Sequence, residues 1–159
     1  MNMNQFALSV IKGMIDLRCG IQPISAMVDV TSTLGADGGV GLIPGQSVKL
    51  VPSNIRGVPK VIECTTDADD IYGFVSYNNK DAKYMRGERL EILVGRGAVM
   101  YMEANAAITQ GAEVAVLIAG VKVITATSTD RIIGRAFDGA SAQGKIIRVT
   151  LDLPGLIKA

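Results

Sequence analysis

The sequence predicts an all-β protein, because short runs of β-branched and aliphatic residues alternate with clusters of turn-forming residues. Four such runs follow one another between Gly111 and Leu151, where Gly, Ser, Thr and Asp fill the gaps. Glycine makes up 18 of the 159 residues without the period of collagen, which predicts many tight turns. We therefore expect a single-domain antiparallel β-barrel or sandwich, with a jelly roll among the alternatives, and at most one or two short helices.

One pattern of strand-like segments occurs twice along the chain. The first copy comprises residues 45–51, 71–75 and 87–94, and the second comprises residues 111–116, 132–136 and 144–149. In each copy a glycine begins the first and third segments, and another glycine lies inside the second segment. Each copy supplies three aligned strands, and we expect these strands to close one barrel or sandwich.

Residues 1–30 differ in pattern from the rest and are assigned to an N-terminal arm, of which Ala26–Val30 fits a first strand. The arm contains an apolar run before its first strong turn signal, the Gln22-Pro23 pair. The members of this run are Phe6, Leu8, Val10, Ile11, Met14 and Ile15. The arm either packs on its own domain as an edge strand or reaches a neighbouring subunit, because exposed edges and apolar termini favour pairing with a partner.

The β domain is expected over residues 31–153, and residues 154–159 form a C-terminal tail. In this tail, Leu156 and Ile157 follow the Pro154-Gly155 pair, which we expect to end the last strand. These two side chains would then lie outside the sheet, where another subunit can cover them. Together with the first four members of the apolar run of the arm, they are the predicted residues of an interaction surface.

Charge and composition exclude several classes of partner. Lys and Arg number 16 against 15 Asp and Glu, spread over the whole chain, so no large basic field attracts nucleic acid or anionic lipid. Aromatic residues make up only 4% of the chain and Trp is absent, which leaves few platforms for base stacking. The longest apolar stretch, Val114–Ala126, contains Gly120 and Lys122 and is shorter than the ~20 residues that cross a bilayer. We expect an aliphatic core and neither nucleic acid nor membrane as a partner.

The residue types that most catalytic mechanisms require are missing. The chain has no histidine, which excludes Ser-His-Asp and Cys-His catalysis and histidine-ligated zinc. Asp67, Asp69 and Asp70 form the only acidic cluster, but an EF-hand-type loop needs a longer series of oxygen ligands that ends in Glu. We expect these carboxylates to accept hydrogen bonds from their own backbone instead. The sequence therefore predicts no catalytic residue, no metal, no cofactor and no enzymatic activity.

Two glycine-rich stretches lack the patterns that bind phosphate. Thr31–Gly41 leads to a turn and another strand, and not to a helix, so we expect a mobile surface loop there. Gly95-Arg96-Gly97 separates two strand-like runs and predicts a short hairpin.

Cys19 and Cys64 are expected to be buried, reduced thiols, with a disulfide between them as the alternative, because they lie far apart in the sequence and neither belongs to a Cys-x-x-Cys pair. The N-terminus also lacks the basic leader of a secretion signal. Both observations indicate a reducing compartment.

A series of motifs runs through residues 44–151. It consists of Pro44-Gly45-x-x-Val48-Lys-Leu50, Ile71-Tyr-Gly-Phe-Val75, Val99-Met-Tyr-Met-Glu103 and Ile133-Gly-Arg-Ala-Phe-Asp-Gly-Ala140 with the strand that closes at Val149. This series resembles the small head decoration, or cement, proteins of tailed bacteriophages. Ile-Gly-Arg-Ala and its following loop are the most specific part, whereas residues 1–40 match less clearly.

The resemblance implies a β-barrel or sandwich that binds the outer surface of the expanded phage capsid and holds neighbouring capsomers together. It implies the major capsid protein and further copies of this chain as partners, with a homotrimer favoured and a dimer second. Such a protein is made in the cytoplasm of the bacterial host and lies on the outside of the virion. The predicted contacts with the capsid or with another subunit are Phe6, Leu8, Val10, Ile11, Leu156 and Ile157.

Two other functions are kept as alternatives. A carbohydrate-binding or other ligand-binding module would use the loop that carries Tyr77 and Tyr84 to hold sugars. A carboxylate-based enzyme would need a cleft that collects at least two of four acidic residues, which are Asp67, Asp69, Asp70 and Glu103.

Overall fold

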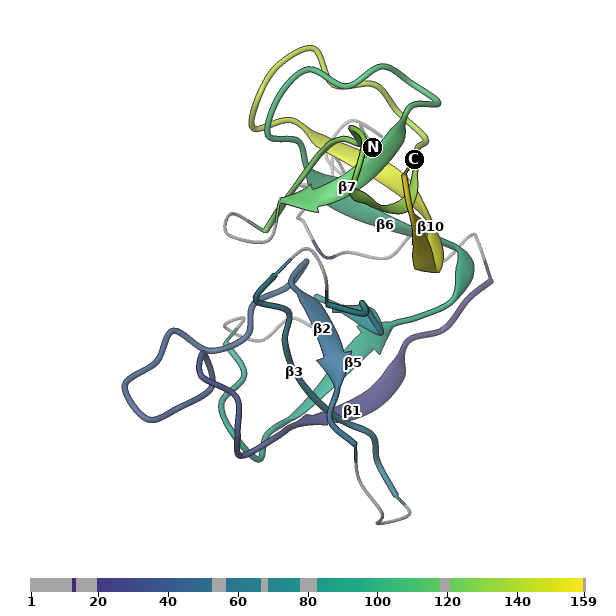
Figure 1. Cartoon of the computed structure of the whole chain (residues 1–159). Helices are drawn as coiled ribbons and strands as arrows, with labels where there is room; N and C mark the ends of the chain where they lie inside the picture. Colours follow the sequence, from purple (N-terminus) through teal and green to yellow (C-terminus); the bar gives the residue numbers. More distant parts are fainter. Residues whose placement is uncertain are drawn as a thin grey trace, which may run out of the picture.

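The described residues form ten strands in two lobes and no helix, so the predicted all-β class is confirmed (Figure 1). The computed structural model describes residue 13 and residues 20–52, 57–66, 69–77, 83–117 and 121–158. Within these ranges, no helix is long and apolar enough to cross a membrane. Lobe 1 contains β1 (Ile24–Val28), β2 (Ser47–Leu50), β3 (Lys60–Glu63), β4 (Gly73–Val75) and β5 (Arg89–Leu93). Lobe 2 contains β6 (Arg96–Glu103), β7 (Glu113–Leu117), β8 (Lys122–Thr125), β9 (Arg131–Ala136) and β10 (Ile146–Ile157).

Lobe 1 is a closed barrel in the order β1-β3-β2-β4-β5, in which β5 returns to β1. Neighbouring strands are antiparallel, except for β1 and β3, which are parallel. The inward positions are aliphatic: Leu90 and Ile92 of β5 are buried, whereas Glu91 between them is exposed. The alternating aliphatic side chains that predicted the strands therefore also fill the interior of the barrel.

Lobe 2 repeats the strand order of lobe 1. Its sheet has the order β6-β10-β9-β7-β8, and a parallel bridge between Ala104 and Val123 joins the end of β6 to β8. In this arrangement β6 corresponds to β1. The strands β7, β8, β9 and β10 correspond, in that order, to β2, β3, β4 and β5, and they run in the same relative directions. The duplication is confirmed, but each copy forms its own five-stranded unit and does not contribute three strands to a common barrel.

Matching hydrogen bonds close the same turns in both lobes. Before β2, the N–H of Gly45 donates to the carbonyl of Val75 at 2.8 Å, and before β7 the N–H of Gly111 donates to the carbonyl of Ala136 at 2.8 Å. Both glycines have positive φ angles, 84° and 80°. Glycine adopts this conformation without strain, so the repeated backbone geometry explains this repeated glycine.

Close approach between strands explains a second repeated glycine. A Cβ atom on Gly73 would lie 2.7 Å from the carbonyl oxygen of Leu93, and one on Gly134 would lie 2.0 Å from the carbonyl oxygen of Thr150. Gly73 and Gly134 hold equivalent positions in β4 and β9, next to equivalent positions of β5 and β10. A larger residue would push the paired strands apart.

A single apolar cluster joins the two lobes. Phe74 of β4 and Leu93 of β5 are register partners, and both side chains point away from the barrel interior, which Val75 and Ile92 occupy. Phe74 and Leu93 are fully buried, in the same cluster as Met100 of lobe 2. From lobe 1 the cluster also includes Cys64 and Ile71. Lobe 1 therefore completes the core of lobe 2.

The predicted hairpin around Gly95 and Gly97 is wrong, because the strands on its two sides belong to different lobes. β5 pairs with β1 and β4, whereas β6 pairs with β10. The two glycines have φ angles of 89° and 81° and turn the chain out of lobe 1 into lobe 2.

The expected arm and tail both overlap with strands. β1 lies within the segment assigned to the arm, and β10 continues beyond Pro154. The register of β10 with β9 shifts between Leu151 and Leu156 and then resumes, with Gly155 at a φ of 78° inside the irregular part. Pro154 and Gly155 thus form a bulge that interrupts the ladder without ending the strand. The expectation that Leu156 and Ile157 lie outside the last strand is therefore wrong.

Replacing Gly134 by Ala should destabilise the protein, because the new Cβ would meet the carbonyl oxygen of Thr150 at 2.0 Å. We expect the free energy of unfolding to fall by about 3 kcal/mol or more, measured by urea denaturation. Gly139→Ala is the matched control, since its Cβ would stay 3.3 Å from the nearest atom, the carbonyl oxygen of Ile108. This control should cost less than about 1 kcal/mol, and equal losses in the two variants would contradict the account.

Phe74→Ala should destabilise both lobes together, because this side chain is buried in the core of lobe 2 although its strand belongs to lobe 1. The expected loss is about 3–5 kcal/mol in a single unfolding transition. Phe137→Ala, at a position 49% exposed, is the control and should cost about 1 kcal/mol or less. Calorimetry that showed two separate transitions, with only one of them shifted, would refute a shared core.

Candidate interaction surface

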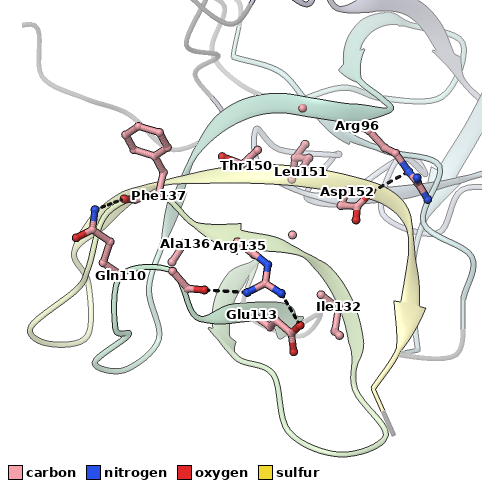
Figure 2. A pocket seen from close by; sticks show the side chains of 13 residues that line it. Arg96, Gln110, Glu113, Ile132, Arg135, Ala136, Phe137, Thr150, Leu151 and Asp152 are labelled. Atoms are coloured by element: carbon pink, nitrogen blue, oxygen red, sulfur yellow. Dashed lines mark hydrogen bonds and ion pairs between the residues drawn. The ribbon is translucent and has the colours of Figure 1, made fainter.

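An open groove of about 740 Å³ lies on the outer face of lobe 2 (Figure 2). Residues of β6, β7, β9 and β10 and of the turns next to them line it. Four of the residues that line the groove have small side chains or none, and these are Gly97, Gly111, Gly134 and Ala136.

Two ion pairs border this groove. Arg135 donates to the carboxylate of Glu113 at 3.0 Å and to the carbonyl of Gly111 at 3.3 Å, and Arg96 pairs with Asp152 at 2.8 Å. The side chains of Arg135 and Arg96 are 66% and 74% exposed, so water screens both pairs and they add little to stability. Their guanidinium groups remain accessible as donors to a partner molecule.

An aromatic ring lies at the end of the groove opposite the Arg96–Asp152 pair (Figure 2). This ring belongs to Phe137, which is half exposed and lies 4.3 Å from the guanidinium carbon of Arg148. Arg148 donates to both carboxylate oxygens of Asp138 at 2.7 Å, which lowers the pKa of Asp138. Exposed aromatic and arginine side chains are enriched in protein interfaces, so this end of the groove is suited to contact with a protein.

A buried carboxylate in lobe 1 forms a second polar site. Glu63 is 3% exposed and accepts hydrogen bonds from the hydroxyl of Ser32 at 2.6 Å and from the N–H groups of Thr33 at 2.7 Å and Leu34 at 3.0 Å. The hydroxyl of Thr33 donates to it as well. The loop 31–41, expected to be mobile, is thereby held against the barrel at its first turn.

The hydrogen bonds decide the charge state of Glu63. Burial raises the pKa of this carboxyl, but the donors of Ser32, Thr33 and Leu34 outweigh burial and lower the pKa from 4.5 to about 2. Sequence reasoning did not select Glu63, because the donors lie about 30 residues away in the chain. Only the barrel closure brings them together.

Four of the six predicted contact residues, Phe6, Leu8, Val10 and Ile11, lie outside the described residues. The other two belong to β10, where the backbone of Leu156 pairs with Ile132 and that of Ile157 pairs with Arg131. The six residues are therefore not shown to form one surface.

Gly13 lies between the two lobes. Its N–H donates to the carbonyl of Tyr101 in lobe 2 at 2.7 Å, and its carbonyl accepts from the N–H of Tyr77 in lobe 1 at 2.9 Å. A Cβ atom at this position would lie 2.5 Å from Cβ of Pro44. Gly13 is therefore enclosed at the junction of the lobes.

The predicted backbone role of the acidic cluster is confirmed for Asp69. Its carboxylate accepts the N–H groups of Thr65 at 2.7 Å and Thr66 at 3.1 Å. Lobe 2 repeats this turn, since the N–H of Thr127 donates to Asp130 at 2.7 Å. The carboxylates thus stabilise equivalent turns before β4 and β9.

The carboxylates considered for an enzyme form ion pairs with different basic side chains. The ion pairs are Asp69–Lys49 at 2.7 Å, Asp70–Arg131 at 3.0 Å and Glu103–Lys122 at 2.8 Å. Asp67 lies outside the described residues. In the part of the chain that is described, no three Cys, Asp or Glu side chains lie close enough to hold a metal ion.

Two further predicted residues lie in the interior. Tyr84 is 2% exposed within the core of lobe 1, so its ring cannot stack on a sugar, and the predicted sugar-binding role of this residue is wrong. Cys64 is a buried free cysteine, as predicted, and burial raises the pKa of its thiol to about 11. Cys19 lies outside the described residues.

No protein-family model and no curated protein matches this chain. Among solved structures, the chain is similar to the N base of the head fiber gp8.5 of bacteriophage phi29. The two are 8% identical, and the alignment covers 87% of this chain and 99% of that chain with a TM-score of 0.47.

Glu63→Gln should lower the free energy of unfolding by about 3 kcal/mol at pH 7, because the low pKa reports how strongly the site stabilises the charged form. The difference from the unchanged protein should shrink as pH falls from 4.5 toward 2, since the folded pKa lies below the unfolded one. Urea denaturation across this pH range measures both effects. Glu91→Gln, on the exposed face of β5, is the control and should change stability by less than about 0.5 kcal/mol at either pH.

Proposed function

We propose that this protein is a structural component of a phage virion that binds the outer surface of the expanded capsid and cements neighbouring capsomers. The major capsid protein is its partner, and further copies of the chain associate with it, as a homotrimer or, second, as a dimer. The protein is made in the host cytoplasm and acts on the outside of the head, without catalysis.

The observation that carries this proposal is the core shared by the two lobes. Because Phe74 and Leu93 of lobe 1 are buried in the core of lobe 2, the two lobes are packed into one body with two separate outer faces. A rigid body with two faces can contact two neighbouring capsomers, and the second contact then forms within the complex. Weak individual contacts thereby give slow dissociation.

The sequence resemblance supports the same class of protein. Its most specific motif, Ile133–Ala136, lies in β9 and contains Gly134, which allows β10 to approach closely. The motif therefore belongs to the part of lobe 2 that supports the groove. An enzyme receives no comparable support, since Asp69, Asp70 and Glu103 are bound to separate cations.

Co-sedimentation with expanded heads of the phage that encodes this chain tests the proposal. The purified protein should sediment with the heads in fixed stoichiometry and should raise the temperature at which they release DNA. A chain that stays in the supernatant at micromolar concentration would refute a capsid-binding role.

Removal of residues 1–12 tests the arm without removing the enclosed Gly13. A milder variant combines Phe6→Ser with Leu8→Ser, and its matched control combines Asn2→Ser with Asn4→Ser. If the arm contacts the capsid, the deletion and the first pair should weaken co-sedimentation at least tenfold with unchanged thermal stability, and the control pair should not. A loss of stability instead would indicate that the arm packs on its own lobes.

A further inference from the structure

The groove on lobe 2 is the structural equivalent of the face by which lobe 1 packs on lobe 2. In lobe 1, Phe74 of β4 and Leu93 of β5 are register partners on the outer face of the barrel. In lobe 2, the strands at the same places in the order, β9 and β10, pair Arg135 with Thr150. Arg135 and Thr150 both line the groove.

The face in lobe 1 is covered within the chain, whereas its equivalent is open. Phe74 and Leu93 are 0% exposed because lobe 2 lies over them, and Gly13 packs against Pro44 and Gly45 at the junction of the lobes. The residues equivalent to Pro44 and Gly45 are Gln110 and Gly111, and both of these line the groove. Among the residues that the structure describes, both copies of the docking face are present, and only the copy in lobe 1 is covered.

The side chains of the open face on lobe 2 are typical of a non-obligate interface, from which the partner can dissociate. Where the covered face has Phe74 and Leu93, the groove has Arg135 and Thr150, with Phe137 half exposed beside them. A mixture of polar side chains with one aromatic ring is typical of non-obligate interfaces, whereas an all-apolar face would need permanent cover.

Charge complementarity favours lobe 1 of another copy as the partner. Residues 20–95, which include all strands of lobe 1, contain seven Lys and Arg against nine Asp and Glu, a net charge of −2. Residues 96–159, which include all strands of lobe 2, contain seven Lys and Arg against five Asp and Glu, a net charge of +2. Contact between lobe 2 of one copy and lobe 1 of the next brings opposite charges together, whereas contact between two copies of lobe 2 brings like charges together.

We propose that the groove of lobe 2 binds lobe 1 of a second copy of this chain, in a head-to-tail contact at the open equivalent of the intrachain docking face. Such a heterologous contact closes into a ring when its rotation permits, and a ring of three copies is the smallest cyclic assembly that a head-to-tail contact commonly forms. The inference goes beyond the proposed function, because it holds whether or not the protein binds a capsid.

Sedimentation velocity of the full chain over a range of concentrations tests the contact. The unchanged protein should form species heavier than the 16.7 kDa chain, and association should weaken as salt is raised. Thr150→Arg, which fills the groove, should raise the dissociation constant at least tenfold. Thr125→Arg, on an exposed position of β8, is the matched control and should leave the constant unchanged. A protein that is monomeric at every concentration, or two variants with equal effects, would overturn the proposal.

A mixing experiment distinguishes head-to-tail contact from a symmetric one. Fluorescently labelled Thr150→Arg chain still carries an intact lobe 1, so it should bind to unlabelled unchanged protein although it does not bind to itself. If the labelled variant binds neither, the contact uses the same surface on both copies and the head-to-tail arrangement is refuted.

A second variant keeps the test valid if Thr150→Arg fails to fold. Arg135→Glu reverses the charge of an exposed groove residue and should likewise raise the dissociation constant at least tenfold, whereas Lys145→Glu, the same charge reversal at an exposed position of lobe 2 that does not line the groove, should not. Unchanged association of a folded Arg135→Glu variant would count against the groove. Head co-sedimentation of the same variants is scored separately, so a failure of capsid binding is distinguishable from a failure of self-association.

Discussion

The packing of Phe74 and Leu93 into the core of lobe 2 is the interaction on which the form of this molecule depends. Each of these side chains is fully buried, and burial of a large apolar side chain stabilises a fold by roughly 1.5–3 kcal/mol. Because they belong to β4 and β5, these strands are covered on both faces, by their own barrel and by lobe 2. The packing also compensates for the incomplete closure of lobe 2, whose outer strands meet at the bridge between Ala104 and Val123.

The two lobes share backbone requirements and differ in their outer side chains. Gly73 and Gly134 are both needed because a neighbouring strand leaves no space for a Cβ atom. At the adjacent outer positions, Phe74 in lobe 1 corresponds to Arg135 in lobe 2, and the first is buried while the second is exposed. The same sheet geometry therefore produces a buried interface between the lobes in lobe 1 and an accessible surface in lobe 2.

The candidate surface was only partly predictable. Hydrophobicity selected Leu156 and Ile157 as uncovered residues, yet the bulge at Gly155 lets their backbone rejoin the sheet. The groove consists of residues with no common sequence signal, since Arg96 and Asp152 meet only because β6 pairs with β10. A surface built from four strands depends on the register in which these strands pair. The hydrophobic periodicity of the sequence does not define this register when both faces of a strand are partly covered.

The sequence by itself determined the all-β class, the internal duplication and the repeated glycines, because these depend on local propensity and on backbone conformation. The turn formed by Asp69 was also predictable, since its donors lie within four residues. Only the tertiary structure decided that each copy forms its own five-stranded unit, that Glu63 is buried under a loop 30 residues away, and that one docking face is covered while its equivalent is open. The reason is physical: these features depend on contacts between distant segments, which the pattern of any one segment does not encode.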